Sequence, residues 1–159
     1  ILQRYGLAWE AVIAALLHDV VEDQDVTVAE VCAQFGPAVA EIVDALSERR
    51  HDEQGEVRPW HVRKAEAIEK IRAASAAAAA VKAADVLHNA QSILYDLQHD
   101  GPGVWRRFTR GPEQMLDYYS RIGELVQAKL GSHPLARELL AALAEFAAVV
   151  KQAESQGKR

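Results

Sequence analysis

Apolar residues recur along most of this chain at intervals of three and four, the spacing that places side chains on one face of an α-helix. The clearest stripe lies in the segment that Pro37 opens, and its members are Val39, Ile42, Val43 and Leu46. A second stripe runs through residues 113–130 and directs five side chains inward: Met115, Leu116, Tyr119, Ile122 and Val126. This periodicity predicts a helical protein.

Glycine, proline and capping residues divide the pattern into separate helices. Gly6 closes a first short helix, and Thr27 with Glu30 forms a capping-box signature that starts another. Residues 49–58 are polar and contain Gly55, which predicts a loop. The expected helices cover residues 7–21, 27–35, 37–48, 59–74, 76–98, 113–130 and 135–153.

Composition supports an all-α fold and narrows the function. Half of the 159 residues are hydrophobic, alanine is abundant, and aromatic residues make up only 6%. Such a balance disfavours strands, and the length fits one domain, which we expect over residues 1–153 with a polar tail at 154–159. The net charge of −5 argues against general binding to nucleic acid or to a membrane surface.

The single cysteine, Cys32, cannot form an internal disulfide, which fits a reducing cytosol, and we expect its small side chain to fill space in the core. No apolar run approaches the roughly 20 residues needed to span a bilayer, and no signal peptide is visible. We therefore expect a cytoplasmic protein. The chain begins at Ile1, and we expect that residues before it are missing.

The predicted helix over residues 7–21 leads from an apolar run into a cluster of charge. Because residues four apart on a helix are neighbours, His18 lies beside Glu22 and Asp19 beside Asp23. Three carboxylates this close repel one another unless a cation or protons neutralise them. Imidazole with carboxylate suits a divalent transition metal, and the remaining carboxylates can act on bound water. Taken alone, the cluster is better explained as a helix end whose histidine is hydrogen-bonded and whose acids are solvated.

A second polar cluster lies on the helix over residues 76–98. Lys82, Asp85 and Asn89 are three and four apart, so they share one face. If this helix packs against the first, Asp85 approaches His18 and Asp19. One histidine and two aspartates would bind Mn²⁺, Fe²⁺ or a similar ion and leave positions for water and substrate oxygens.

In this order the segments resemble the HD-domain metal-dependent phosphohydrolases, in particular the hydrolase domain of RelA/SpoT-type guanosine tetraphosphate (ppGpp) enzymes and their small stand-alone relatives. The resemblance covers residues 7–94. The matching segments are residues 14–23 (AALLHDVVED), Thr27, Phe35-Gly36, Val43-Asp44, Arg63-Lys64 and residues 82–89 (KAADVLHN). The paired motifs make this resemblance specific, whereas a lone His-Asp dipeptide carries no weight.

The resemblance implies that His18 and Asp19 are paired metal ligands and that Asp85 is a distant third. It implies that Glu22 and Asp23 orient or activate the water that attacks phosphorus. The metal would be Mn²⁺, with Fe²⁺, Zn²⁺ and Ni²⁺ as alternatives. The family has a further histidine ligand on the preceding helix; residues 1–6 contain none, and we expect it upstream of Ile1.

The resemblance also implies a set of residues that bind the substrate. Asn89 would form hydrogen bonds within the site, and Arg63 and Lys64 would lie near the substrate phosphates. We also expect Lys82 to bind substrate, with an ion pair to an acid of the site as its alternative. A solvated helix face is the alternative for Arg63 and Lys64. Val86 stands where the family usually has a basic residue, which weakens the expectation of a highly charged nucleotide.

These implications predict a phosphohydrolase that acts on a nucleotide phosphate or pyrophosphate ester, such as the 3′-pyrophosphate of ppGpp. One alternative is an HD-type nucleotidase for another phosphate ester. The other is an HD fold that serves as a non-catalytic sensor or binding module. The apolar stripe on the last helix could serve a homodimer.

Overall fold

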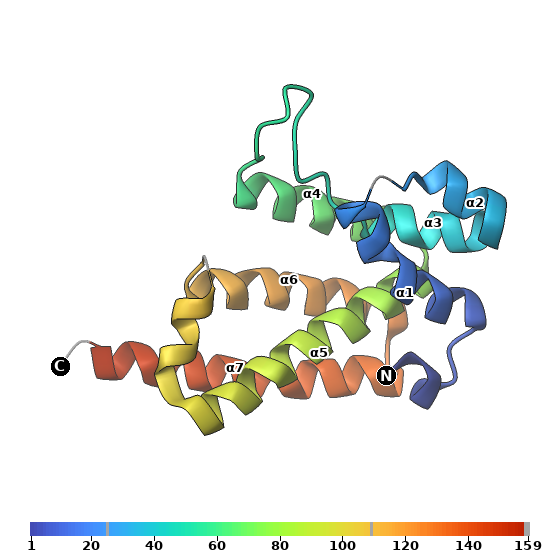
Figure 1. Ribbon diagram of the computed structural model, residues 1–159. Coiled ribbons are helices and arrows are strands. Elements are labelled where there is room, and N and C mark those ends of the chain that lie inside the picture. The colour runs from blue at the N-terminus through green and yellow to red at the C-terminus, as the bar shows by residue number, and fades with distance from the viewer. Residues whose placement is uncertain (25, 109, 158–159) are drawn as a thin grey trace. The chain divides into compact units, whose positions relative to one another are not determined.

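The computed structural model describes residues 1–24, 26–108 and 110–157 (Figure 1). In these ranges the chain forms seven α-helices and two short 3₁₀-helices, and it contains no β-strand, which confirms the predicted all-α fold. The 3₁₀-helices are η1 (Leu2–Tyr5) and η2 (Gly101–Arg107). The α-helices are α1 (Trp9–Asp23), α2 (Val28–Phe35), α3 (Pro37–Leu46), α4 (Trp60–Ala73), α5 (Ala76–Asp100), α6 (Pro112–Leu130) and α7 (Pro134–Gly157).

Several helix ends differ from the sequence prediction, and two of these differences concern the polar residues. Helix α1 continues to Asp23, so that the acidic residues after Val21 are helical. Helix α3 ends at Leu46, which leaves residues 47–48 in an extended segment. Helix α7 continues to Gly157, beyond the predicted end, while residues 158–159 lie outside the described part of the chain.

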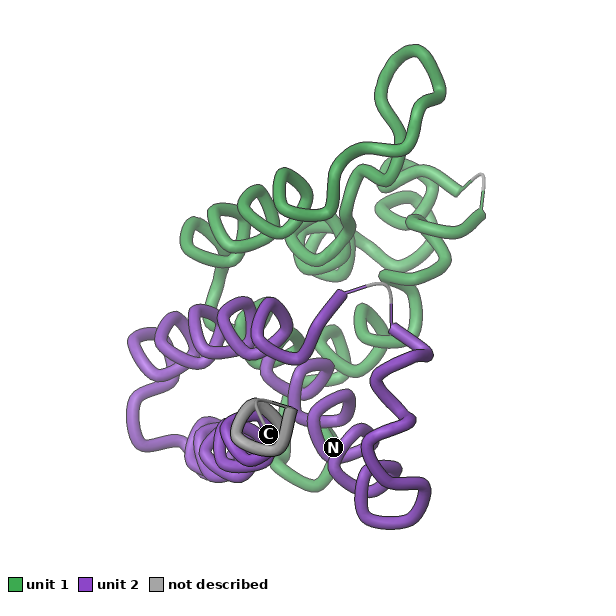
Figure 2. Tube along the Cα trace, turned by 90° about the vertical axis from the view of Figure 1, so that its left-hand side faces the viewer, with its two compact units in different colours: residues 1–82 green, residues 83–159 purple. Residues whose placement is uncertain are grey.

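The chain divides into two compact units, residues 1–82 and residues 83–159 (Figure 2). Helix α5 begins in the first unit and continues in the second. The expectation of one domain over residues 1–153 stays a prediction.

In the first unit α3 is the central helix, because α1, α2 and α4 all pack against it. Its predicted stripe is buried throughout: Val39, Ile42, Val43 and Leu46. Ala11 and Ala14 are the buried residues of α1, and Val31 is the buried residue of α2. Each buried aliphatic side chain of this size contributes about 1.5–3 kcal/mol. This packing holds the polar end of α1 beside the segment that follows α3.

The helix ends in this unit have specific partners. The Thr27 hydroxyl accepts a hydrogen bond from the Glu30 N–H at 3.2 Å, and the Glu30 carboxylate accepts one from the Thr27 N–H at 2.8 Å, which confirms the capping box. The backbone N–H of Thr27 lowers the pKa of Glu30. Gly6 adopts a φ of 67°, the left-handed region that favours glycine, and its N–H caps η1 as predicted.

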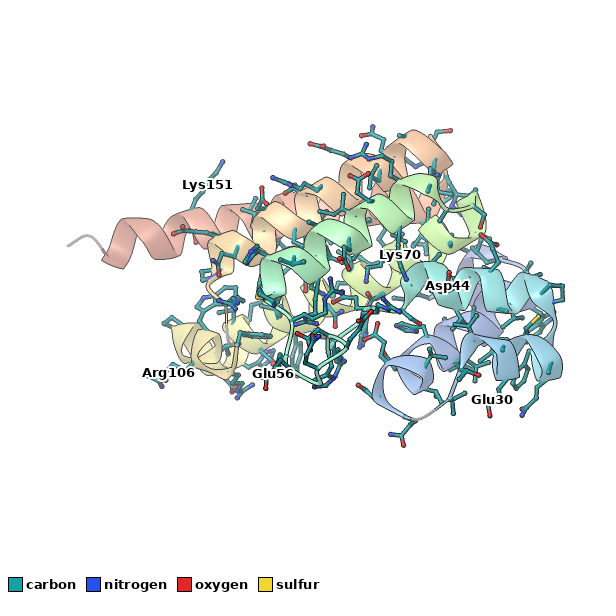
Figure 3. All side chains as sticks on the ribbon, turned by 90° about the horizontal axis from the view of Figure 1, so that it is seen from above. Glu30, Asp44, Glu56, Lys70, Arg106 and Lys151 are labelled. Carbon is teal, nitrogen blue, oxygen red and sulfur yellow. The ribbon has the colours of Figure 1, made fainter. Side chains whose placement is uncertain are left out.

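Lys70 of α4 closes the C-terminal end of α3 (Figure 3). Its ammonium donates hydrogen bonds to the carbonyl oxygens of Asp44 at 2.9 Å and Ser47 at 3.0 Å. The last carbonyls of a helix have no partner within it, and a cation there also interacts favourably with the helix dipole. Lys70 therefore fixes the point at which the chain leaves α3.

In the second unit α6 packs against α7. The helices come close at Gly123, where a Cβ atom would lie 2.9 Å from Leu143 Cδ1. Phe146 of α7 is fully buried, and the ring centroids of Trp105 and Tyr119 lie 5.9 and 5.8 Å from it. Of the predicted inward stripe of α6, Tyr119, Ile122 and Val126 are buried, while Met115 and Leu116 are half-buried.

Two further expectations can be compared with the structure. Cys32 is exposed on α2, so the expectation that it fills core space was wrong. Among the residues described, no helix combines the length and the apolar character needed to cross a membrane.

Candidate functional site

The first half of the candidate site lies at the C-terminal end of α1. Four predicted residues share its last two turns: His18, Asp19, Glu22 and Asp23. The small buried face of this helix, Ala11 and Ala14, packs toward the core, which leaves the charged stripe at its border. Acids at the C-terminal end of a helix oppose its dipole, so this placement requires compensating positive charge.

The imidazole ring of His18 is oriented by a contact of Nδ1 with the backbone. Its Nδ1 lies 3.0 Å from the carbonyl oxygen of Ala15, and because a carbonyl only accepts, Nδ1 carries a proton. Its Nε2 lies 3.2 Å from Asp19 Oδ1. The imidazole and the carboxylate are thus neighbours on the same turn of α1.

This pair fits a divalent metal. Metal–nitrogen and metal–oxygen bonds of about 2.1 Å, at a right angle to each other, separate two ligand atoms by about 3 Å. The hydrogen bond from Nδ1 to a backbone carbonyl is the outer contact that orients metal-binding histidines. His18 Nε2 and Asp19 Oδ1 are therefore close enough for one ion to contact both, and their role as metal ligands stays a prediction.

Glu22 and Asp23 are bound from one side by a short segment after α3, residues 47–50, which we call the strap. Glu22 Oε1 accepts a hydrogen bond from the backbone N–H of Glu48 at 2.9 Å. Arg50 Nη2 donates to Glu22 Oε2 at 3.2 Å, and Arg50 Nη1 lies 2.7 Å from Asp23 Oδ1. One guanidinium therefore bridges both acids.

The strap also binds the two basic residues of α4. The Glu48 carboxylate is buried, with 8% of its side chain exposed, and it accepts hydrogen bonds from Arg63 Nη1 at 3.1 Å and Lys64 Nζ at 2.5 Å. Arg63 Nε is buried, and within the described part of the chain it has no hydrogen-bond partner. Both basic residues therefore form ion pairs with Glu48, and their predicted place near the substrate phosphates stays a prediction.

The network balances its charges. Three carboxylates, those of Glu22, Asp23 and Glu48, face three cations: Arg50, Arg63 and Lys64. The exposed carboxylate of Asp19 is left outside this balance, beside His18. Of the four acidic side chains named here, Asp19 is therefore the one that pairs with none of these three cations.

The remaining predicted residues lie on α5. Asn89 Nδ2 donates a hydrogen bond to Asp85 Oδ1 at 2.9 Å, which confirms that these two share a face. Asp85 is half-buried and Asn89 is exposed, both in the second unit. Lys82 is buried at the end of the first unit.

Among residues 1–24, 26–108 and 110–157, no three His, Cys, Asp or Glu side chains already form a group that could hold a metal ion. The structure brings together His18 with Asp19, Glu22 with Asp23, and Asp85 with Asn89. The complete ligand set stays a prediction.

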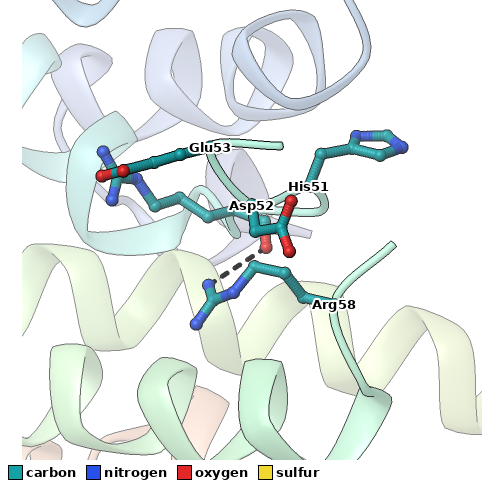
Figure 4. A pocket seen from close by; sticks show the side chains of 5 residues that line it. His51, Asp52, Glu53 and Arg58 are labelled. Carbon is teal, nitrogen blue, oxygen red and sulfur yellow. Dashed lines mark hydrogen bonds between the residues drawn. The ribbon is translucent and has the colours of Figure 1, made fainter. Parts of the chain in front are cut away.

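The strap is followed by a hairpin, residues 51–58. This hairpin borders a hollow of about 350 Å³, whose lining residues are Arg49, His51, Asp52, Glu53 and Arg58 (Figure 4). The hairpin closes through hydrogen bonds from the Arg58 N–H to the Arg50 carbonyl, 2.9 Å, and from Arg58 Nη1 to the Arg49 carbonyl, 3.3 Å. The Arg58 guanidinium also binds Glu66 in a bidentate pair and lowers the pKa of that carboxyl, while Glu66 raises the pKa of Arg58.

Sequence reasoning missed Glu48 and Arg50. It placed Glu48 at the end of a helix and Arg50 in a polar loop, with no role for either. The Arg49-Arg50 pair directly after an acidic residue was the only available signal, and it does not say which acids these cations meet.

The helices and the site define the class of protein. An HD-domain family model matches residues 1–109, so the chain belongs to the HD-domain family, as the sequence motifs predicted. Members of this family that act as phosphohydrolases depend on a divalent metal.

The chain is also similar to individual proteins of known sequence or structure. The chain is 31% identical over 132 residues to a mouse protein named guanosine-3′,5′-bis(diphosphate) 3′-pyrophosphohydrolase MESH1, and the match spans 83% of this chain and 65% of the mouse protein. The crystal structure of lmo0812 from Listeria monocytogenes superimposes with a TM-score of 0.76 at 32% identity, over 89% of this chain and 90% of that one. A metazoan SpoT orthologue, described as hydrolysing ppGpp, gives a TM-score of 0.59 at 28% identity, over 87% and 70% of the two chains.

Proposed function

We propose that this chain is a metal-dependent phosphohydrolase that removes the 3′-pyrophosphate of ppGpp, yielding GDP and pyrophosphate. The observation that carries the proposal is the juxtaposition on α1 of a metal-fitting pair, His18 Nε2 and Asp19 Oδ1, with an acid pair one turn further on. The activity named for the relatives, a ppGpp 3′-pyrophosphohydrolase and a protein that hydrolyses ppGpp, supports the choice of substrate.

His18, Asp19 and Asp85 would hold the metal, for which Mn²⁺ is our first choice. A divalent ion in this place stabilises negative charge on phosphoryl oxygens and makes water more acidic. The Asn89 amide, which donates to Asp85 Oδ1, would orient that ligand. The donor set of one imidazole and two carboxylates is one that Mn²⁺ and Fe²⁺ accept.

Glu22 and Asp23 would orient the attacking water and accept its proton. Their interaction with Arg50 supports the orienting part of this role, because one guanidinium holds both carboxylates at the end of α1. Lys82 and Asn89 would contact the substrate. Arg63 and Lys64, which pair with Glu48, would contribute positive charge near the phosphates. The expected cytoplasmic location and homodimer stay predictions.

The experiment is metal analysis of the purified chain, followed by incubation of ppGpp with added Mn²⁺ and separation of the guanine nucleotides. We expect bound metal and release of GDP with pyrophosphate. Asp85→Ala should lose metal and turnover together. Glu22→Gln should retain metal and turn over about 10²–10⁴-fold more slowly, the usual contribution of a general base. Glu69→Gln, which alters an exposed pair on α4, is the matched control.

The outcomes separate the alternatives. Bound metal without ppGpp hydrolysis, but with release of phosphate from a nucleoside monophosphate, would favour the HD-type nucleotidase. Absence of both metal and turnover with any phosphate ester would favour the non-catalytic module. Normal turnover in both Asp85→Ala and Glu22→Gln would show that the site is assigned wrongly.

A further inference from the structure

Arg50 is the only cation that contacts both acids of the pair, among the contacts of Glu22 and Asp23 that the structure describes. Its two terminal nitrogens bind different carboxylates, Nη2 at 3.2 Å from Glu22 Oε2 and Nη1 at 2.7 Å from Asp23 Oδ1. A guanidinium is rigid and planar, so two contacts from one fork fix the separation and the orientation of the two carboxylates.

The strap holds Glu22 more completely than Asp23. The second oxygen of Glu22, Oε1, accepts the Glu48 N–H, so both its oxygens are bound and 11% of its side chain is exposed. Asp23 is 45% exposed, and Arg50 supplies its ion pair. Without Arg50, Asp23 would therefore keep no described contact that fixes its carboxylate, and Glu22 would keep one.

Arg50 is itself held in place by the hairpin. Its carbonyl oxygen accepts the N–H of Arg58 at 2.9 Å, and the Arg58 guanidinium is bound by Glu66 on α4. The backbone of the strap is therefore held at two points. The Ser47 carbonyl binds Lys70, and the Arg50 carbonyl binds the N–H of Arg58 in the hairpin. A group anchored in this way can impose an orientation on the side chains that it binds.

Charge explains why a cation is needed at this point. Glu22 and Asp23 are adjacent in sequence, repel each other, and both oppose the dipole of α1. Asp19, one turn earlier, adds a third negative charge on the same helix. Arg50 is the cation that the strap brings to these acids, while the Glu48 carboxylate is bound by Arg63 and Lys64.

We propose that Arg50 is a positioning residue for the hydrolytic reaction: its guanidinium fork holds the carboxylates of Glu22 and Asp23 in one orientation toward the attacking water and does not itself contact substrate. This inference rests on the proposed function. It assigns a role to the strap, which none of the sequence motifs includes.

Three variants of the full chain test this role: Arg50→Gln, Arg50→Lys and, as control, Arg72→Gln, which breaks an exposed ion pair with Glu69 on α4. We measure kcat and KM for ppGpp with saturating Mn²⁺, together with metal content. A small displacement of a catalytic group costs about 100-fold in rate, so kcat of Arg50→Gln should fall by about that factor. KM and metal content should stay close to those of the wild type, because in this proposal Arg50 contacts neither the substrate nor the residues that would bind the metal.

Arg50→Lys separates the fork from the charge. A lysine restores the cation but has a single nitrogen and cannot bind two carboxylates in fixed geometry, so it should recover only part of the lost kcat. Full recovery by lysine would overturn the fork as the cause. A loss confined to KM in Arg50→Gln would also overturn the proposal, because it would place Arg50 on the substrate. A kcat of Arg50→Gln equal to that of Arg72→Gln would overturn the proposal as well.

A second measurement does not depend on turnover. In a double-mutant cycle of Arg50→Gln and Asp23→Asn, followed by urea unfolding, the pair should show a coupling of about threefold in the unfolding equilibrium constant. Zero coupling would overturn the inference whatever the activity. A wild-type chain that hydrolyses no ppGpp would overturn the proposed function, and the coupling would then decide by itself whether Arg50 holds the acid.

Discussion

Glu48→Gln is the substitution whose effect on stability the structure defines most sharply. The carboxylate is buried and binds Arg63 Nη1 at 3.1 Å and Lys64 Nζ at 2.5 Å. Glutamine keeps the size and one acceptor oxygen but removes the charge and turns an amide N–H₂ group toward a cation. The backbone N–H of Glu48, which binds Glu22, is unaffected, so the change isolates the side-chain interactions.

The magnitude follows from what the two cations lose. Breaking a buried ion pair from one side costs about 3–5 kcal/mol, because the partner charge is left buried and unpaired. Arg63 and Lys64 keep 19% and 22% of their side chains exposed, so water offsets part of this cost. Since Arg63 Nε is already buried without a partner, the offset is incomplete. We expect the free energy of unfolding to fall by about 2–3 kcal/mol.

The assay is urea unfolding followed by far-ultraviolet circular dichroism, with Tm measured in parallel. For a chain of this size the loss corresponds to a fall in Tm of roughly 5–10 °C. Glu69→Gln removes an exposed ion pair with Arg72 and should change the free energy of unfolding by less than about 0.5 kcal/mol. If Glu48→Gln costs no more than Glu69→Gln, the reasoning from the buried network is wrong.

Three further substitutions test separate contacts in the first unit. Thr27→Ala removes the capping box of α2 and should lower the free energy of unfolding by about 1 kcal/mol, measured by urea unfolding. Lys70→Met removes both hydrogen bonds to the end of α3 and should cost about 1 kcal/mol in the same assay. Glu66→Gln should change the pH dependence of stability. Because Arg58 lowers the pKa of Glu66 below 4.5, the pair contributes stability above pH 4.5 that is lost as the pH falls through the lowered pKa.

Each of these expectations has a contrary result. If Thr27→Ala and the wild type unfold at the same urea concentration, the capping box does not stabilise α2. An unchanged free energy of unfolding in Lys70→Met would mean that water replaces its contacts with the carbonyls of Asp44 and Ser47. For Glu66→Gln the stability difference from wild type should be constant above pH 4.5 and shrink below it. A difference that grows on acidification would contradict the direction of the pKa change.

Local sequence determined the helices and the neighbours within them. The capping box at Thr27, the left-handed glycine at position 6 and the apolar stripe of α3 depend on contacts between residues a few positions apart. Helical spacing brings Asn89 to Asp85 in the same way. His18 and Asp19 are adjacent in sequence, and in the structure His18 Nε2 lies 3.2 Å from Asp19 Oδ1.

Helix ends and exposure were less predictable, because they depend on competing contacts. Helix α1 continues through two acids that oppose its dipole, which the sequence alone disfavours; Arg50 offsets their charge. Helix α3 stops at Leu46, where Lys70 binds its last carbonyls. Cys32 lies on the outer face of a short helix, and a single cysteine gives no sign of which face it occupies.

Only the tertiary structure decided how the charges are paired. Glu22 binds groups 26 and 28 positions further along the chain, and Glu48 binds residues 15 and 16 positions away. No helical or strand period relates such positions; packing of α1 and α4 against α3 brings them together. The sequence by itself therefore determined the helices and the chemical groups at the site. Which cation neutralises which acid depended on the tertiary packing, because electrostatic partners are selected by distance in space and not by distance along the chain.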